Sequence, residues 1–291
     1  MSADQRTGQP LGHSSLQRRS AARTAVVWDA VRDLLDRDLP AAGRTVEQSP
    51  RRAFVVDVGG GTGEVAVRVA ELGHRVVVVD PSPDALAILA RRADERGVAD
   101  LVTGQQGDLD SLPTLFPESA RSADSADSAG GVGGAGGVGT AGEVDVVLCH
   151  GVLEIVDDPA SALAVLAGVL RPGGTLSLLV NQRHAAVVAR AMAGHFAQAR
   201  TLLDPDTGTP PEGPGPHRRF TVDEITTVLD ETGFDVDSMH AVRVFVDLVP
   251  SSLVDLEPGA GQALVDLERA VSTRPEYLAL ATQIHTLATR R

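Results

Sequence analysis

The chain has 291 residues, 43% of them hydrophobic, which is enough for one large domain with a well-buried core. A small scaffold held by disulfides or a structural metal is excluded, because Cys149 is the only cysteine and no Cys/His cluster has zinc-site spacing. The net charge is −13 and every basic residue is an arginine, so any role with nucleic acid needs a local basic surface that works against the global charge.

Hydrophobic periodicity predicts alternating helices and strands along the chain. An amphipathic helix is expected over 20–39. Strands are expected at 54–58, 76–79, 101–103, 144–149, 175–180, 236–245 and 284–289. Further helices are expected at 65–72, 85–96, 159–170, 185–203 and 222–232, with a turn at 171–174. Continuous valine runs are typical of strands that are covered on both faces. The pattern predicts an α/β fold with a doubly wound, mostly parallel, seven-stranded sheet.

Three segments depart from this regular pattern. Residues 1–17 are polar and are expected to form a disordered tail before a domain that spans 18–291. Residues 117–143 consist mainly of Ser, Ala and Gly and are expected to form a low-complexity insert. Residues 182–220 are expected to form a helical and proline-rich cap, since five prolines fall within 204–216.

No segment of the sequence predicts export or membrane insertion. The first thirty residues lack an apolar signal region, and runs such as 76–79 and 146–148 are far shorter than the roughly 20 residues of a membrane span. We therefore expect a soluble, cytoplasmic protein with no membrane partner and no metal.

A glycine-rich loop, DVGGGTG, runs from Asp57 to Gly63 after the first expected strand. Ligands bind at this place in open α/β sheets, because glycines allow close approach and the next helix offers free N–H groups. Tight turns use the same residues. Glu64 stands where a dinucleotide fingerprint needs its third glycine, which argues against NAD. The loop also lacks the Gly-Lys-Ser/Thr ending of an ATP-hydrolysing P-loop.

Two acidic residues follow the next expected strands. Asp80 ends the second strand, where it can accept hydrogen bonds from a ribose diol or serve as a turn acid before Pro81. Asp108 follows the third strand, where it can accept from an adenine amino group or be a solvated loop acid.

Taken in order, Asp57, the glycines Gly59, Gly60, Gly61 and Gly63, Asp80, Asp108 and the strand before His150 resemble the motif series of class I S-adenosylmethionine-dependent methyltransferases. The likeness covers roughly residues 50–180 and includes LRPGGTL at 170–176. It implies a Rossmann-like fold and S-adenosyl-L-methionine as cofactor.

Four further stretches resemble one family, the bacterial tRNA 5-carboxymethoxyuridine methyltransferases. They are RTAVVW at 23–28, CHGVLE at 149–154 with the following Asp158, residues 181–196, and VRVF at 242–245 followed by Asp247. This resemblance implies cofactor contacts at Arg23, Gly59, Gly60, Asp80, Gln106, Gly107 and His150. Arg23 would pair as a fork with the methionine carboxylate of the cofactor. Taken alone, Arg23 reads as a solvated helix residue and His150 as a structural one.

The acceptor that this resemblance implies is a carboxylate, the 5-carboxymethoxy group of a wobble uridine in tRNA. A carboxylate is ionised at neutral pH, so its methylation needs alignment and desolvation and no general base. The candidates to hold it are Arg243, Asn181, Arg183 and His184. The alternatives are a strand-edge role for Arg243, a solvated helix start for Arg183 and His184, and a helix cap for Asn181.

The chain also departs from that family. It has Leu179 and Val180 where the family has aromatic residues, and the proline-rich segment 204–216 replaces a lysine-rich stretch. We expect a methyltransferase of class EC 2.1.1 that acts in tRNA processing on the anticodon loop, which presents single-stranded bases. The alternatives are methylation of a small-molecule acid or other metabolite, a non-catalytic nucleoside-cofactor-binding protein, and an NAD-dependent oxidoreductase.

Overall fold

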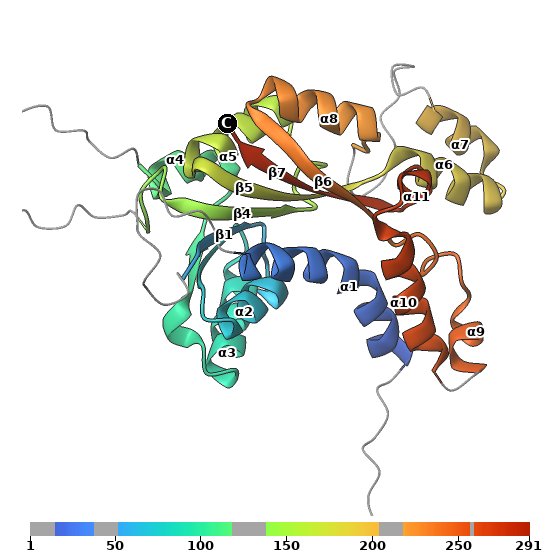
Figure 1. Ribbon diagram of the computed structural model, residues 1–291, viewed down its shortest axis with the longest axis horizontal. Coiled ribbons are helices and arrows are strands. Elements are labelled where there is room, and N and C mark those ends of the chain that lie inside the picture. The colour runs from blue at the N-terminus through green and yellow to red at the C-terminus, as the bar shows by residue number, and fades with distance from the viewer. Residues whose placement is uncertain (1–14, 38–51, 118–137, 204–217, 257–258) are drawn as a thin grey trace, which may run out of the picture.

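One seven-stranded sheet runs through the computed structural model, which describes residues 15–37, 52–117, 138–203, 218–256 and 259–291 (Figure 1). Its strand order is β3-β2-β1-β4-β5-β7-β6. The strands are β1 (Phe54–Val58), β2 (Arg75–Asp80), β3 (Val102–Gln106), β4 (Val144–His150), β5 (Leu170–Asn181), β6 (Phe234–Val242) and β7 (Gln283–Arg290). The sheet is mixed, because β7 runs antiparallel to both β5 and β6 while the strands from β3 to β5 are parallel.

Helices cover both faces of this sheet. In chain order they are α1 (Ser15–Asp36), α2 (Glu64–Glu71), α3 (Pro83–Glu95), α4 (Leu112–Leu115), α5 (Pro159–Val169), α6 (Arg183–Met192), α7 (Phe196–Leu203), α8 (Val222–Glu231), α9 (Ser251–Leu256), α10 (Ala260–Ser272) and α11 (Pro275–Leu278), with the short 3₁₀ helices η1 (Ala99–Leu101) and η2 (Leu109–Ser111). Helices α1, α2 and α3 lie on one face, and α5 and α8 lie on the other (Figure 1). None of the described helices is both long and apolar enough to cross a membrane.

The valine-rich strands form the boundary between two hydrophobic cores. Val76 and Val78 of β2 pack with α1, α2 and α3, whereas Val77 and Val79 pack into the core that also contains α5 and α8. All four valines are fully buried. Successive strand residues point to opposite faces, so a run without polar residues is what a sheet covered on both sides requires.

Local signals account for where several helices begin. The Ser82 side chain accepts a hydrogen bond from the Ala85 N–H at the start of α3, and Pro83 follows it at the first helical position. Thr221 and Glu224 form a reciprocal capping box at the start of α8. These caps satisfy N–H groups that have no partner within the helix.

The structure corrects several expected boundaries. The helix expected over 185–203 is two helices, α6 and α7, because the chain turns at Gly194 with φ of 78°. The strand expected over 236–245 ends at Val242, since Arg243 has φ of 61°. The turn expected at 171–174 is a bulge at the start of β5, between the pairs Val144–Leu170 and Val146–Thr175.

Some elements were not predicted from the sequence, and some predicted segments lie outside the described residues. Helices α9, α10 and α11 were not predicted, and α10 packs against α1, where Arg269 pairs with Asp29 at 2.7 Å. Residues 1–14 of the expected tail, 118–137 of the expected insert and 204–217 of the expected cap lie outside the described residues.

Candidate functional site

The glycine loop connects β1 to α2 at the carboxyl ends of the parallel strands. A Cβ atom on Gly63, which has φ of 72°, would lie 2.0 Å from Cδ1 of Leu89. A Cβ on Gly60 would lie 2.4 Å from Oδ2 of Asp57. Arg92 of α3 donates to the carbonyl of Thr62 at 2.9 Å and so holds the loop against that helix. Both glycine positions therefore exclude larger residues.

Two buried acids lie under and beside this loop. Asp80 accepts from the Gly61 N–H through Oδ2 and from the Ser82 N–H through Oδ1, each at 2.9 Å. The side chain of Asp57 has no hydrogen bond or ion pair with a residue that the structure describes. Burial, and then the negative charge of Asp80, raise the pKa of Asp57 to about 7. The site thus holds a carboxyl group whose negative charge has no partner within the described protein.

The turn after β3 lies beside Asp80. The Gly107 N–H donates to the Asp80 carbonyl at 3.2 Å, and the Gln106 side-chain amide donates to the Pro81 carbonyl at 3.3 Å. Asp108 forms a reciprocal capping box with Ser111 at the start of η2. Asp108 is therefore an exposed helix cap, and the structure brings Gln106 and Gly107 to the same sheet edge as Asp80.

A chain of polar side chains, in which Ser177 and His285 are fully buried, starts at His150, the last residue of β4. Nε2 of His150 and the Ser177 hydroxyl lie 2.9 Å apart, and the same hydroxyl lies 2.8 Å from Nε2 of His285. The ring of His240 stacks on that of His285 with centroids 5.3 Å apart. Burial lowers the pKa of His150 to about 4, so its imidazole is neutral at pH 7. The interpretation of His150 as an isolated structural residue omitted its link to Ser177 and His285.

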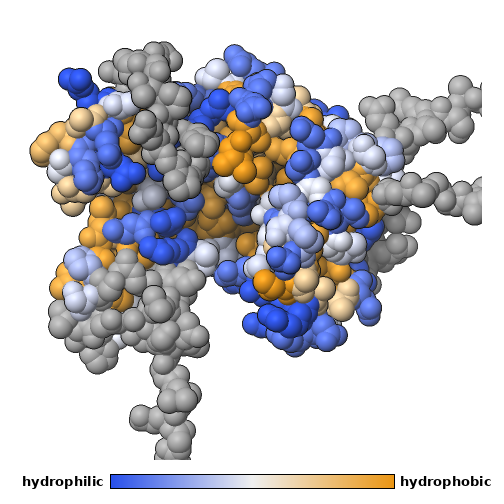
Figure 2. Space-filling view, turned by 180° about the vertical axis from the view of Figure 1, so that it is seen from behind, coloured by the Kyte–Doolittle hydropathy of each residue, from blue (hydrophilic) through white to orange (hydrophobic). Residues whose placement is uncertain are grey.

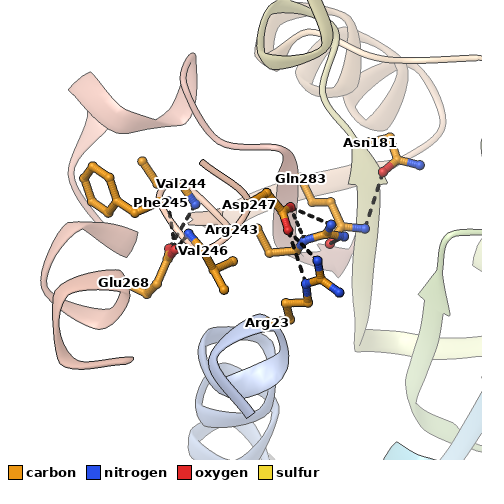
Figure 3. Close-up of polar contacts among 9 residues, drawn as sticks. All are labelled: Arg23, Asn181, Arg243, Val244, Phe245, Val246, Asp247, Glu268 and Gln283. Atoms are coloured by element: carbon orange, nitrogen blue, oxygen red, sulfur yellow. Dashed lines mark hydrogen bonds and ion pairs between the residues drawn. The ribbon is translucent and has the colours of Figure 1, made fainter. Parts of the chain in front are cut away.

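Five side chains form a continuous polar network where β5, β7 and β6 meet α1 (Figure 3). Asp247 accepts from Arg23 at 2.8 Å and from Nε of Arg243 at 2.8 Å. Arg243 also donates to Gln283, whose amide donates to Asn181, each at 3.4 Å. The structure thus brings together Arg23, Asn181 and Arg243, which lie far apart in the sequence.

Glu268 of α10 shapes the loop that carries this network. Its buried carboxylate accepts hydrogen bonds from three successive backbone N–H groups, those of Val244, Phe245 and Val246, at 2.8 to 2.9 Å (Figure 3). Charge-assisted bonds of this kind are stronger than neutral ones. Glu268 therefore fixes the backbone between Arg243 and Asp247.

The start of α6 differs from the expectation. Gln182 caps this helix by accepting from the Ala185 N–H at 3.0 Å, so the interpretation of Asn181 as the helix cap is wrong. Nη2 of Arg183 donates to both carboxylate oxygens of Glu224 at 2.7 and 2.9 Å. His184 is exposed on the first turn. Arg183 is thus paired and not freely solvated.

Several site residues were not selected from the sequence: Ser177, Glu154, Gln283, Asp247, Glu268, His285 and Arg219. Single Ser, Gln and Glu residues carry no motif, so their positions emerge only when strands pair. Asp247 and Glu154 lie in stretches that carry the family resemblance, and that is the one signal that could have found them.

The molecule is hollowed near the centre of the face that is seen from behind, and hydrophobic side chains gather around the hollow (Figure 2). Within the described part of the chain, no group of His, Cys, Asp or Glu residues is arranged to hold a metal ion. The polar atoms at the carboxyl edge are instead carboxylates, amides and guanidinium groups.

Comparisons with known proteins agree with this geometry. Residues 56–176 match the family described as methyltransferase domain. The magnesium protoporphyrin IX methyltransferase of Synechocystis PCC 6803, solved with bound SAH, is 15% identical with a TM-score of 0.54 over 98% of this chain and 90% of its own. The match is to a methyltransferase domain, and the structural likeness shows that the chain has the fold of that solved enzyme.

Two curated relatives are similar to the chain in sequence. The tRNA 5-carboxymethoxyuridine methyltransferase of Escherichia coli (strain K12) is 28% identical over 91% of this chain and 87% of its own length. The ubiquinone biosynthesis O-methyltransferase of Xanthomonas axonopodis pv. citri (strain 306) is 30% identical over 53% of each chain. The predicted resemblance to the tRNA-modifying family is confirmed as a similarity.

Proposed function

We propose that this methyltransferase esterifies the carboxylate of 5-carboxymethoxyuridine at the wobble position of tRNA in the cytoplasm, with S-adenosyl-L-methionine as methyl donor. The observation that carries the proposal is the extent of the similarity to the E. coli enzyme. It covers 91% of the chain, whereas the methyltransferase domain match covers only residues 56–176. The similarity therefore includes elements such as α6, α7 and α8, which lie outside the common domain.

The residues at the carboxyl edge fit the cofactor. The glycine loop lets the backbone approach a ligand, and the second lone pair of each Asp80 oxygen remains for a ribose diol. Asp57 offers an uncompensated negative charge to a cationic ligand. Arg23 would hold the methionine carboxylate, and Gln106, Gly107, Asp108 and His150 lie around the same edge. When bound, S-adenosyl-L-methionine supplies an electrophilic methyl group.

The chain's task toward the acceptor is to hold a carboxylate in line and keep water away from it. Arg243 is a candidate, together with Asn181, Arg183 and His184. Arg243 now pairs with Asp247, and Arg183 pairs with Glu224, so both would exchange a protein carboxylate for that of the acceptor. Such an exchange preserves the charge pairing of each guanidinium group.

A local basic surface supports RNA as the acceptor. Residues 182–203 contain three arginines and two histidines and no acidic residue, and Arg219 lies beside the start of α6, where Arg183 donates to its carbonyl at 3.1 Å. Met192 and Phe196 are 72% and 71% exposed on α6 and α7, so they offer apolar surface for unstacked bases. Because the net charge of the chain is −13, a role with nucleic acid requires a local basic surface, and this surface is one.

The first test combines calorimetric titration with S-adenosylhomocysteine and transfer of labelled methyl to total tRNA, with and without esterase pretreatment. We expect saturable binding and base-labile labelling that increases after esterase treatment. Labelling of small acids but not of tRNA would overturn the acceptor, and absence of binding would overturn the cofactor assignment.

Replacing Asp80 tests the cofactor cradle within the same assay. Asp80→Ala should weaken S-adenosylhomocysteine binding by roughly 10-fold or more, because ribose hydroxyls lose a charged acceptor in a buried site. Asp84→Ala, which removes an exposed acid from the first turn of α3, is the matched control and should bind normally. Equal affinity for both variants would remove Asp80 from the ribose.

A second candidate is methylation of a small-molecule acid or other metabolite. It is favoured by the net charge and by the similarity to the ubiquinone biosynthesis enzyme over half of the chain. Labelled-methyl transfer to free carboxymethoxyuridine at the rate found with tRNA would support this candidate. Binding of the cofactor without any transfer would support a non-catalytic role, and hydride transfer with NAD would support an oxidoreductase.

A further inference from the structure

The arginines at the carboxyl ends of β4 and β5 differ in how their charges are used. Arg183 is paired with Glu224, and the Arg218 guanidinium donates to the carbonyls of Val156 and Asp157 at 3.2 and 3.1 Å. The half-buried guanidinium of Arg219 makes no hydrogen bond or ion pair with any residue that the structure describes. The guanidinium group of Arg219 therefore has N–H donors that no described residue accepts.

Backbone contacts place Arg219 beside the acceptor region. The preceding residue, Arg218, donates its N–H to the Glu154 carbonyl in the loop after β4. The following residue, Phe220, donates its N–H to the Asn181 carbonyl at the end of β5, and Arg183 donates to the carbonyl of Arg219 itself at 3.1 Å. Arg219 is thereby held between the two strand ends that carry His150 and Asn181.

The charges around Arg219 favour an external anion. Burial is the larger cause that lowers the pKa of Arg219. The positive charge of Arg190 on α6, which lies nearby, lowers this pKa further. Glu154 is buried and lies close to Arg219, but its Oε1 already accepts the Asn181 N–H at 2.7 Å and its Oε2 has no partner among the described residues. Burial also raises the pKa of Glu154, which weakens it as a competing anion.

We propose that Arg219 is the residue that recognises the acceptor carboxylate, as a bidentate fork, with Arg190 adding long-range attraction. A guanidinium group matches a carboxylate with two parallel N–H···O bonds, which a lysine cannot reproduce. The proposal rests on the proposed function and adds to it the residue that selects a carboxylate over the neutral ester product. Arg243 and Arg183 then stay with Asp247 and Glu224 throughout the reaction.

The kinetic test compares Arg219→Gln with Arg218→Gln, which removes the same charge from the neighbouring residue. We expect Arg219→Gln to raise the KM for tRNA bearing carboxymethoxyuridine by roughly 10- to 100-fold, with S-adenosylhomocysteine affinity unchanged. Arg219→Lys should recover only part of this loss. Arg218→Gln should lower thermal stability but keep KM within about threefold. Equal KM increases in both glutamine variants would overturn the proposal.

A binding test needs no catalysis. Titration with methoxyacetate, which is a free carboxymethoxy group, should shift the side-chain NMR resonance of Arg219 saturably. Its methyl ester should cause no shift, and inorganic phosphate should bind more weakly. Tighter binding of phosphate would overturn the proposal and make Arg219 a contact to the RNA backbone. If wild-type protein methylates tRNA while Arg219→Gln binds methoxyacetate normally, the inference fails and the proposed function stands. If methoxyacetate binds through Arg219 but no RNA is methylated, the proposed acceptor fails and the site stands.

Discussion

The two ends of the parallel strands treat buried negative charge in opposite ways. At the amino ends, Asp145 is paired with Arg171 at 2.7 Å and also accepts the Phe54 N–H at 2.9 Å, and both side chains are at most 10% exposed. At the carboxyl ends, Asp57 is buried without a described partner, and Asp247 is shared by two partly exposed arginines. The amino end is closed by its own contacts, whereas the carboxyl end keeps charge available for ligands.

The largest expected effect is at the closed end. Asp145→Ala should lower the free energy of unfolding by about 3 to 5 kcal/mol, because the Arg171 charge is left buried and unpaired. Urea denaturation of wild type and variant measures the difference. The paired change Asp145→Leu with Arg171→Met should cost less than the single change. S-adenosylhomocysteine affinity should remain unchanged, and a loss of affinity would contradict the separation of the two ends.

Asp57 should make stability depend on pH in the opposite sense from a paired acid. Its pKa rises from 3.8 to about 7 on folding, so the folded protein binds an extra proton between these values and stability falls as pH rises toward 7. Asp57→Asn should remove this fall and stabilise the protein near pH 8 by at most about 4 kcal/mol. Denaturation of both proteins at pH 5 and pH 8 measures the effect. A difference that does not change with pH would show that Asp57 is compensated.

Replacing Ser177 tests whether its hydrogen bonds fix the tautomer of His150 at the carboxyl ends of the strands. Its hydroxyl donates one proton, so one neighbouring histidine donates to it and the other accepts. Nδ1 of His285 is buried without a partner, and a bare nitrogen costs less there than an N–H, so His285 carries its proton on Nε2. His150 then carries its proton on Nδ1.

We expect ¹⁵N NMR of the wild type to report this tautomer. Ser177→Ala should mix the tautomers of His150 and cost about 1 to 3 kcal/mol of stability. Ser161→Ala, an exposed hydroxyl on α5, is the control that should leave the His150 signals in place. A protonated Nε2 on His150 in the wild type would reverse the assignment.

The smallest expected stability effects are at the open ion pair. Arg243→Ala should lower the free energy of unfolding by less than about 1 kcal/mol, since the ion pair with Asp247 is partly exposed to water and such pairs contribute little. Arg243→Gly should be more stable than Arg243→Ala by up to about 1 kcal/mol, because glycine tolerates the φ of 61°. Both variants should keep turnover and S-adenosylhomocysteine affinity, because Arg243 stays paired with Asp247 while Arg219 holds the acceptor. Loss of turnover alone would make Arg243 the residue that holds the acceptor carboxylate, in place of Arg219. Equal loss of turnover and affinity would make Arg243 structural.

The expected strands were close to those observed wherever hydrophobic runs were continuous. The first strand has the expected bounds, and β2 and β4 extend the expected ranges by only one or two residues. Helices α2, α3, α5 and α8 lie within two residues of their expected ends. Burial on both faces leaves a strong signature in the sequence, because every position along such a strand must be apolar.

Boundaries set by single backbone angles were missed. Arg243 gives no sign in the sequence of its positive φ, since arginine seldom adopts that conformation. The alternative interpretation of Asn181 as a helix cap shows the same limit, because Gln182, one residue later, supplies the cap and Asn181 accepts from Gln283. Which of two adjacent polar residues caps a helix depends on where the strand before it ends.

By itself, the sequence determined the α/β alternation, the glycine loop after β1 and the acids at the strand ends, because each of these depends on residues that are close together in the chain. Only the tertiary structure decided which charges are compensated. Arg23 and Asp247 are 224 residues apart, Ser177 and His285 are 108 apart, and strand pairing and helix packing bring them together. Arg219 is uncommitted for the same reason, since its neighbours in space come from the loop after β4, the end of β5 and α6.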